Sequence, residues 1–330
     1  MTKTAISTTS SSSTQANRLA PPSLNLIGAG KLGQTLARLW SDNGYFHIAQ
    51  VMTQHRDTAQ TACEFIGSGQ AVWQAEDLLP ADVYLIATPD LTIETALTQL
   101  LELDVLTAPK SESTTQTPAI VFHCSGALSS NLLEKAANVG LATASIHPIH
   151  SFASPANSLS QFKGSTCTYE GHEKALSVLL PAFASLGATL LPVQGENKSL
   201  YHAGSVIACN YLVALIEASL ECFAAAGINR HDAAALLEPL MTNTMSNVLG
   251  DHRGASTSGP SLTGPIARGE SAIVAEQVVE LDKHLPQYAP LYRELGKVAV
   301  SIARAQNSAS SEALEKIQQL LQSPPSGRLP

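Results

Sequence analysis

Apolar residues in the first half of the chain form two kinds of segment that alternate. Short, nearly uninterrupted apolar runs are typical of buried strands, whereas apolar residues three or four positions apart are typical of helices. This pattern predicts strands at 24–27, 48–52, 83–87 and 119–123, and helices at 34–43, 57–66 and 91–101. Strands that alternate with helices indicate a parallel sheet covered by helices on both faces.

The pattern continues toward the middle of the chain and then changes. Strands are expected at 141–147, 166–171 and 188–193, with a helix at 174–186. After Gly195 only helical segments follow, at 198–226, 230–249, 271–284, 287–305 and 309–322. The expected fold class is therefore α/β, with an N-terminal α/β domain at 23–195 (core 23–150) and an all-α C-terminal domain at 196–323.

Polar segments lie outside these elements. Ten of residues 2 to 14 are Ser or Thr, so we expect residues 1–22 to form a disordered polar tail. The segment at 107–118 has the composition of a surface loop, and the one at 251–261 separates two helices.

Composition and charge narrow the class of protein. The 330 residues are 44% hydrophobic and carry a formal net charge of −8, which argues against nucleic-acid and anionic-membrane partners. No uninterrupted apolar run reaches the roughly 20 residues of a membrane span. Five irregularly spaced cysteines fit a cytoplasmic protein with reduced thiols and no metal site.

A glycine motif stands between the first predicted strand and the first predicted helix. In a dinucleotide site the first glycine forms a tight turn, the second admits the pyrophosphate, and the third lets helix and strand pack closely. The helix N-terminus then binds the pyrophosphate through its free N–H groups. We expect this cofactor site at Gly28, Ala29, Gly30, Lys31, Leu32 and Gly33; the alternative is a glycine-rich turn without a ligand.

The end of the second strand favours NADP over NAD. An acidic residue normally binds the ribose 2′-hydroxyl of NAD there. Thr53 and Arg56 occupy this region instead, and a guanidinium suits a 2′-phosphate. Asp57 leaves NAD possible as the cofactor, and the alternative for Arg56 is a solvated loop residue without a ligand.

After the next strand, Thr88, Pro89 and Asp90 are expected to line the cofactor, unless Asp90 only caps the following helix.

Two further strand ends carry histidines. We expect His123 and Ser125 to contact substrate and His147 to donate a proton to a carbonyl being reduced. The alternatives are that His123 is a buried, hydrogen-bonded strand residue and that Ser125 caps a helix at 128–138. Pro148 is consistent with a rigid turn after His147.

The first segment of the helical half has polar residues on one side. Lys198, His202 and Asn210 follow a helical spacing, and we expect them to act on the substrate. A water-facing side is the alternative, although the small residues around them leave room for a ligand. Further along, Thr263 and Arg268 are candidates to bind a substrate carboxylate, unless Gly269 and Ser271 simply cap a helix.

Together these motifs resemble a known family. GAGKLG, ATPD, HCSGALS, SIHPIHSF and LTGPIARGE occur in this order in Rossmann-like proteins with a C-terminal domain of unknown function, of the DUF2520 type. The resemblance covers residues 23 to about 305 and extends to the 6-phosphogluconate dehydrogenase-like superfamily. It implies a homodimer, a Lys and an Asn that contact substrate from the first helix after the nucleotide domain, and a cleft-facing His147, as in the His-Pro turn of prephenate dehydrogenases.

These observations predict an NADP-dependent oxidoreductase. Hydride transfer would take place between the nicotinamide and a small keto or hydroxy acid, of which ketopantoate is one example. The alternative is a non-catalytic NAD(P)-binding redox sensor, which has no need of the polar residues Lys198, His202 and Asn210.

Overall fold

The computed structural model describes residues 20–107, 118–250 and 262–322. The expected tail up to residue 19, most of the 107–118 loop and all of 251–261 lie outside these residues. The chain divides into two compact units, Met1–Ile207 and Ala208–Pro330. The division falls inside the helix α7 (Lys198–Ala225), after Ile207, whereas the predicted boundary lies at residue 195.

The first unit is built on one mixed sheet of eight strands within the described residues. Its order is β3-β2-β1-β4-β5-β6-β7-β8, and neighbouring strands are parallel except for β6 and β7. The strands are β1 (Ser23–Ile27), β2 (His47–Met52), β3 (Gln70–Val72), β4 (Val83–Ile86), β5 (Ile120–His123), β6 (Ala142–Ile149), β7 (Thr166–Gly171) and β8 (Thr189–Pro192).

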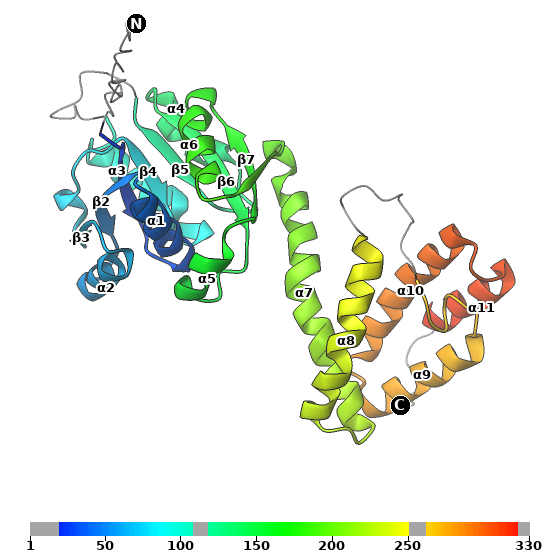
Figure 1. Ribbon diagram of the computed structural model, residues 1–330. Coiled ribbons are helices and arrows are strands. Elements are labelled where there is room, and N and C mark those ends of the chain that lie inside the picture. Colours follow the sequence, from blue (N-terminus) through cyan, green and yellow to red (C-terminus); the bar gives the residue numbers. More distant parts are fainter. Residues whose placement is uncertain (1–19, 108–117, 251–261, 323–330) are drawn as a thin grey trace, which may run out of the picture. The chain divides into compact units, whose positions relative to one another are not determined.

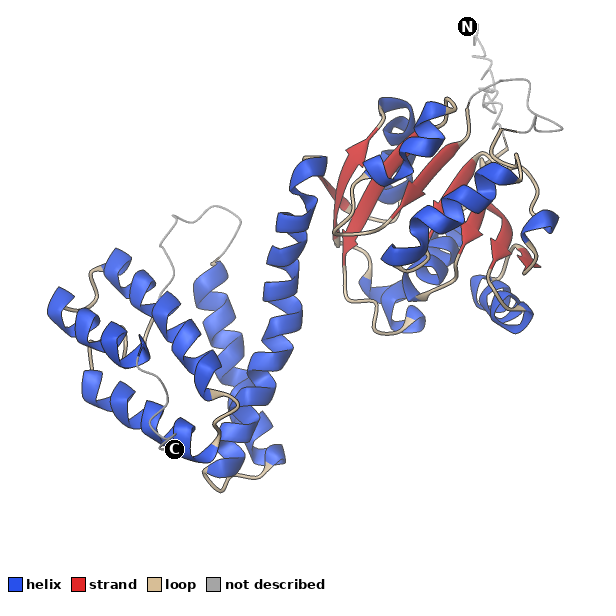
Figure 2. Cartoon of the chain, turned by 180° about the vertical axis from the view of Figure 1, so that it is seen from behind, coloured by secondary structure: helices blue, strands red, loops and turns tan. Residues whose placement is uncertain are grey.

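Helices cover both faces of this sheet (Figure 2). Successive strand residues point to opposite faces, so one strand contributes to two cores. In β4, Val83 and Leu85 pack in one core, and Tyr84 and Ile86 pack in the other. The first core includes α1 (Lys31–Asn43), α2 (Arg56–Ile66), α5 (Pro155–Gln161) and α6 (Glu173–Ala184); the second includes α3 (Ile93–Glu102) and α4 (Glu134–Asn138).

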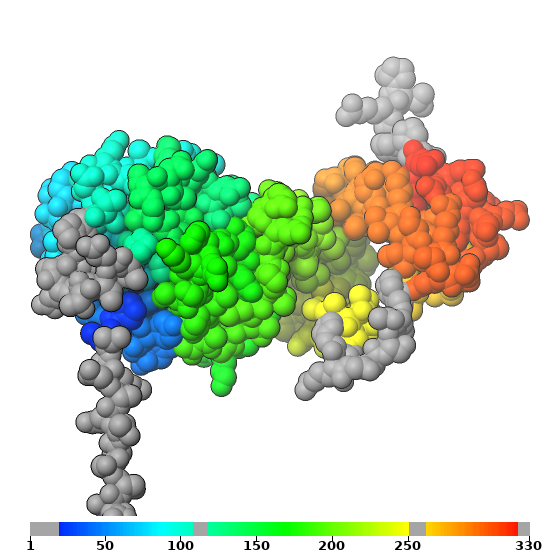
Figure 3. Space-filling view, turned by 90° about the horizontal axis from the view of Figure 1, so that it is seen from above, coloured from blue at the N-terminus to red at the C-terminus, as the bar shows by residue number. Residues whose placement is uncertain are grey.

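The second unit contains only helices among its described residues. They are the rest of α7, α8 (Arg230–Leu249), α9 (Ser271–His284), α10 (Ala289–Gln306) and α11 (Ser311–Gln322), labelled in Figure 1. Val274, Val300 and Ile317 are completely buried where α9, α10 and α11 pack together. These three helices form one compact body in the space-filling view of Figure 3.

The structure confirms the predicted fold class and differs from the prediction in three details. β3 is an additional strand of three residues, too short to give a periodic signal. β7 runs antiparallel to β6, a direction that an apolar pattern does not encode. The helices expected at 91–101 and 128–138 each begin with a short 3-10 turn, at Asp90–Thr92 and Ser130–Leu133.

α7 has an unusual combination of hydropathy and exposure. Over Gly195–Ala225 it contains an 18-residue window of mean hydropathy 1.6, of which 11% is buried inside the protein. By length and composition alone this helix is able to cross a membrane, which a count of uninterrupted apolar residues did not reveal. One such helix is weak evidence of a span, because core helices of soluble proteins have the same composition. What it does establish is an apolar surface that the described chain leaves largely uncovered.

Candidate active site

The loop between β1 and α1 requires two of its three glycines for the fold itself. Gly28 has a φ of +85°, and its N–H donates to the carbonyl of Met52 at 2.8 Å. A Cβ on Gly28 would lie 2.8 Å from the Cγ2 of Thr88, and one on Gly33 would lie 3.0 Å from the Cβ of Ala87. Larger residues would therefore push α1 away from the ends of β1 and β4.

Gly30 is different, because nothing in the fold requires it to be small. The nearest atom to a Cβ built on Gly30 is the carbonyl oxygen of Ala87, at 3.9 Å. Gly30 is also the N-cap of α1, and no side chain caps that helix end. The first N–H groups of α1, from Lys31 onward, therefore face open space, the arrangement that binds a pyrophosphate. The residues fit the cofactor that the motif predicted.

We call the loop at 28–33 and the N-terminus of α1 the cradle. A cavity of about 130 Å³ lies beside it. It is lined by Leu32, Ile86, Ala87, Thr88, Asp90, Ile93, Cys124 and Ser125. The Thr88 hydroxyl is buried without a hydrogen-bond partner in the described structure, which is costly unless a ligand satisfies it. Thr88 and Asp90, which the sequence predicted to line a cofactor, both line this cavity.

A hydrogen bond between Asp90 and Ser125 connects the loop after β4 to the loop after β5. The Ser125 hydroxyl donates to the Asp90 carboxylate at 2.7 Å and accepts the N–H of Leu128 at 3.0 Å. Asp90, which follows Pro89, makes no capping hydrogen bond; the N-cap of α3 is Thr92. Ser125 does stabilise the turn at Leu128, although the 3-10 helix begins later. Both side chains are therefore held rigidly at the cavity wall.

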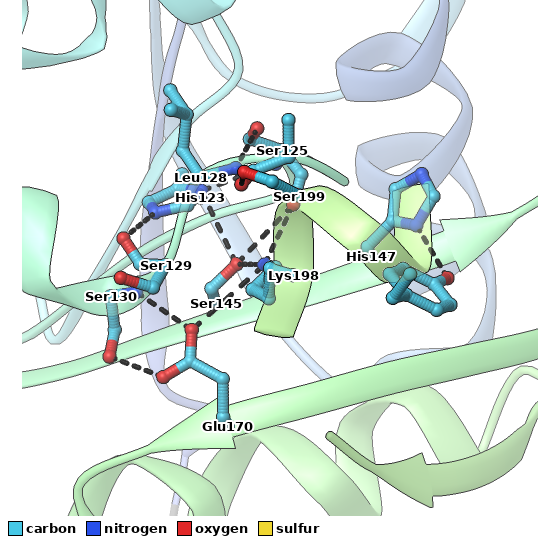
Figure 4. Close-up of polar contacts among 12 residues, drawn as sticks. His123, Ser125, Leu128, Ser129, Ser130, Ser145, His147, Glu170, Lys198 and Ser199 are labelled. Carbon is cyan, nitrogen blue, oxygen red and sulfur yellow. Dashed lines mark hydrogen bonds and ion pairs between the residues drawn. The ribbon is translucent and has the colours of Figure 1, made fainter. Parts of the chain in front are cut away.

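Lys198, the first residue of α7, is buried within the nucleotide-binding unit. Only 1% of its side chain is exposed, and Figure 4 shows its ammonium pointing toward Ser145 and Ser125. Lys198 donates to the Ser145 hydroxyl and, at 2.8 Å, to the carbonyl of Ser125; Glu170 lies 3.9 Å away. Glu170 in turn accepts the N–H and the hydroxyl of Ser130, at 2.7 and 2.6 Å. Burial lowers the pKa of Lys198, and Glu170 opposes that change.

This placement gives Lys198 a structural role that the sequence did not predict. Its ammonium contacts β6, β7 and the loop after β5. A buried ammonium with these partners fixes the Ser125–Ser130 loop against the sheet. The lysine therefore positions the cavity wall that Ser125 and Asp90 form.

His123 is a buried, hydrogen-bonded strand residue, which was the alternative to its contact with substrate. Its side chain is completely buried; Nδ1 accepts the Ser125 N–H at 3.2 Å, and Nε2 lies 3.2 Å from the carbonyl of Ser129. Burial, together with the charge of Lys198, lowers the His123 pKa to about 4, so the ring is neutral at physiological pH. With both nitrogens engaged, His123 shapes the loop and does not contact a substrate in this conformation.

A second group of side chains surrounds Gly126. Nδ1 of His147 lies 2.9 Å from the Tyr201 hydroxyl, and the ring centroids of His147 and His202 are 5.6 Å apart. A Cβ on Gly126 would lie 2.3 Å from Nδ1 of His202 and 2.9 Å from Nε2 of His147. These two nitrogens thus both pack against Gly126, at a position where only a glycine fits.

The electrostatics of His147 favour a neutral ring. Burial lowers the pKa of His147 to about 4, and the neighbouring His202 and Lys198 act in the same direction. Nδ1 of His202 is buried without a partner among the described residues. An unsatisfied imidazole nitrogen beside a neutral imidazole is suited to bind one polar atom of a ligand or to exchange a proton with it.

The remaining candidates lie elsewhere in the chain. Asn210 is exposed and lies twelve residues after Lys198 on α7, which is about 18 Å along the helix axis. Thr263 and Arg268 belong to the second unit and are exposed; the Arg268 guanidinium is bound by Glu270 through two contacts of 2.9 Å. Glu270 is the N-cap of α9, so neither Gly269 nor Ser271 has the capping role considered above. All three belong to the second unit.

Three residues of the site were missed from sequence. Glu170 ends a strand with no motif around it, so only the fold reveals its contact with Ser130 and Lys198. Tyr201 directly precedes His202 in the sequence, but adjacent helix residues point in different directions, so it was not grouped with the polar residues. Gly126 follows Ser125 in the HCSGALS motif, but its function depends on two distant histidines.

The fold and the cradle define a Rossmann-type protein with a C-terminal helical part. Residues 165–299 match the family model described as "Domain of unknown function (DUF2520)", which confirms the resemblance seen in the motifs. A comparison with curated proteins gave no match.

Solved structures resemble the chain over most of its length. Protein TM1727 from Thermotoga maritima is 26% identical, with a TM-score of 0.63 over 86% of this chain and 99% of that one. An imine reductase from Myxococcus stipitatus, in complex with NADP⁺, is 13% identical, with a TM-score of 0.60 over 91% and 100%. A pyrroline-5-carboxylate reductase from Coxiella burnetii is 17% identical, with a TM-score of 0.54 over 92% and 99%. These neighbours share the fold, and two of them are reductases.

Proposed function

We propose that the protein is an NADP-dependent oxidoreductase that transfers a hydride between nicotinamide and a small keto or hydroxy acid, with ketopantoate as one example. The open space above Gly30, at an uncapped helix N-terminus, carries the proposal. The Myxococcus stipitatus structure, which contains NADP⁺ in the same fold, supports it. The nicotinamide supplies or accepts the hydride when it is bound.

The other roles in the reaction belong to residues of this chain. Thr88 and Asp90 bind and orient the nicotinamide half of the cofactor beside the cavity. The imidazoles of His147 and His202 bind the reacting oxygen of the substrate and exchange a proton with it. Lys198 keeps the loop between these two groups in place. A redox sensor would need Thr88 and Asp90 to bind the cofactor, but it would not need the histidine pair.

Replacing Gly30 by Val tests the cofactor site without disturbing the fold. A Cβ at Gly30 meets no atom closer than 3.9 Å apart from its chain neighbours, so the melting temperature should change little. The same side chain fills the space of the pyrophosphate, and the Kd for NADPH should rise about ten-fold or more, measured by calorimetry. Gly204→Ala, at a second unobstructed glycine, is the matched control. An unchanged Kd in Gly30→Val would remove the basis of the proposal.

We also propose that the protein works as a homodimer in the cytoplasm, with no membrane or nucleic-acid partner. The support is the exposed apolar surface of α7 and α8, where Val213 and Leu240 are 68% and 60% exposed. Sedimentation equilibrium without detergent should give twice the mass of the chain. The double variant Val213→Asp/Leu240→Asp should lower the measured mass toward that of one chain. Leu91→Asp, at a residue that is 97% exposed in the first unit, should leave the mass unchanged. Protein that stays soluble only with detergent would contradict the proposal.

A further inference from the structure

An aromatic ring supports Arg56 at the edge of the cofactor cradle. The Cζ of Arg56 lies 4.9 Å from the ring centroid of Trp73, which is within the range of a cation–π contact. Trp73 is 38% exposed. The pair therefore lies at the surface, where it is accessible to a ligand.

The backbone fixes where this pair lies relative to the cradle. Met52 and Val72 pair across the parallel strands β2 and β3, and Trp73 directly follows Val72. Met52 also accepts the N–H of Gly28 from the glycine loop. Arg56 begins α2, three residues beyond Thr53, whose hydroxyl donates to the carbonyl of His55 and so restrains the connecting turn. The pair thus stands at the carboxyl ends of β2 and β3, beside the cradle.

The charge of Arg56 is left uncompensated. No carboxylate of the described residues forms an ion pair with it. A guanidinium that stacks through its face keeps its N–H groups, which lie in the plane of the group, free for a bidentate contact with a phosphate. An arginine without such support samples many rotamers and loses entropy when it binds.

We propose that Trp73 is the positioning residue for cofactor selectivity: it holds Arg56 in the orientation that binds the 2′-phosphate of NADP. This inference rests on the proposed function and adds to it the residue that separates NADPH from NADH. Trp73 acts through Arg56 and contributes little to the parts that the two cofactors share.

A double-mutant cycle measured by calorimetry tests this role, with NADPH and NADH as the two probes. Arg56→Ala should raise the Kd for NADPH about ten-fold or more and leave the Kd for NADH within two-fold. Trp73→Ala should raise the Kd for NADPH about two- to five-fold, again without an effect on NADH. In the Arg56→Ala background the Trp73→Ala change should have no further effect on NADPH. Trp73→Phe, which keeps an aromatic face, should restore most of the affinity.

Two results would overturn the inference while leaving the proposed function intact. One is an equal loss of affinity for NADPH and NADH in Trp73→Ala, which would make the ring a structural or adenine-binding residue. The other is a loss that remains in the Arg56→Ala background. If the wild-type protein bound neither cofactor, the proposed function itself would fail, and the inference with it.

Discussion

Replacing Lys198 by Met is expected to lower the free energy of unfolding of the nucleotide-binding unit by about 3–5 kcal/mol. Met keeps most of the volume but removes the ammonium that Ser145 and the Ser125 carbonyl share. It also leaves the Glu170 carboxylate, only 14% exposed, without a cation nearby. Breaking one side of a buried ion pair costs far more than the net value of the intact pair. Tryptophan fluorescence is a suitable probe, because Trp40 and Trp73 both belong to this unit.

Two further variants separate this effect from a general effect of losing a lysine. Lys135, in the same unit, makes an exposed contact of 3.0 Å with Glu94, and Lys135→Met should cost no more than about 1 kcal/mol. Adding Glu170→Gln to Lys198→Met should recover part of the lost stability, because the uncompensated charge is then gone. If Lys198→Met unfolds as Lys135→Met does, the buried network does not support the loop, and Lys198 would be free to act on a substrate.

Most of the fold was predictable from sequence because burial leaves a periodic signal. β4 alternates between two cores, and its neighbours do the same, so short apolar runs located the strands well. Strand direction has no such signal, and the antiparallel β7 therefore appeared only in the structure. The three residues of β3 form a strand because β2 offers an edge, which is a tertiary effect.

The site was harder to predict, because it depends on distance as well as on residue type. Angular spacing correctly grouped Lys198 and His202, which are one turn apart on α7. The same reasoning grouped Asn210 with them, although twelve residues along a helix correspond to about 18 Å. The structural role of Lys198 was not predicted for another reason: its partners Ser145 and Glu170 come from strands that lie far from it in the sequence.

The imidazole pair offers the most direct test of the site, because it needs no knowledge of the substrate. In Gly126→Ala the new Cβ would lie 2.3 Å from Nδ1 of His202 and 2.9 Å from Cε1 and Nε2 of His147. Both rings must move away from the loop, and His147 should become hydrated. Since burial is the main cause that lowers the His147 pKa to about 4, this pKa should rise toward its ordinary value of 6.5. That is a change of more than about 100-fold in proton affinity.

Proton NMR titration of the histidine ring signals measures this change, with His147→Gln used to assign the resonance. Gly204→Ala is the matched control, because that glycine lies on α7, as His202 does, with nothing within 4 Å of its Cβ position. It should leave the His147 titration unaltered and, by improving helix propensity, stabilise α7 by up to about 1 kcal/mol. A His147 that still titrates near pH 4 in Gly126→Ala would show that the burial of the two rings does not depend on the absence of a side chain at residue 126. The convergence of their nitrogens would then be an incidental feature of packing, and the proton exchange proposed for them would lose its geometric basis.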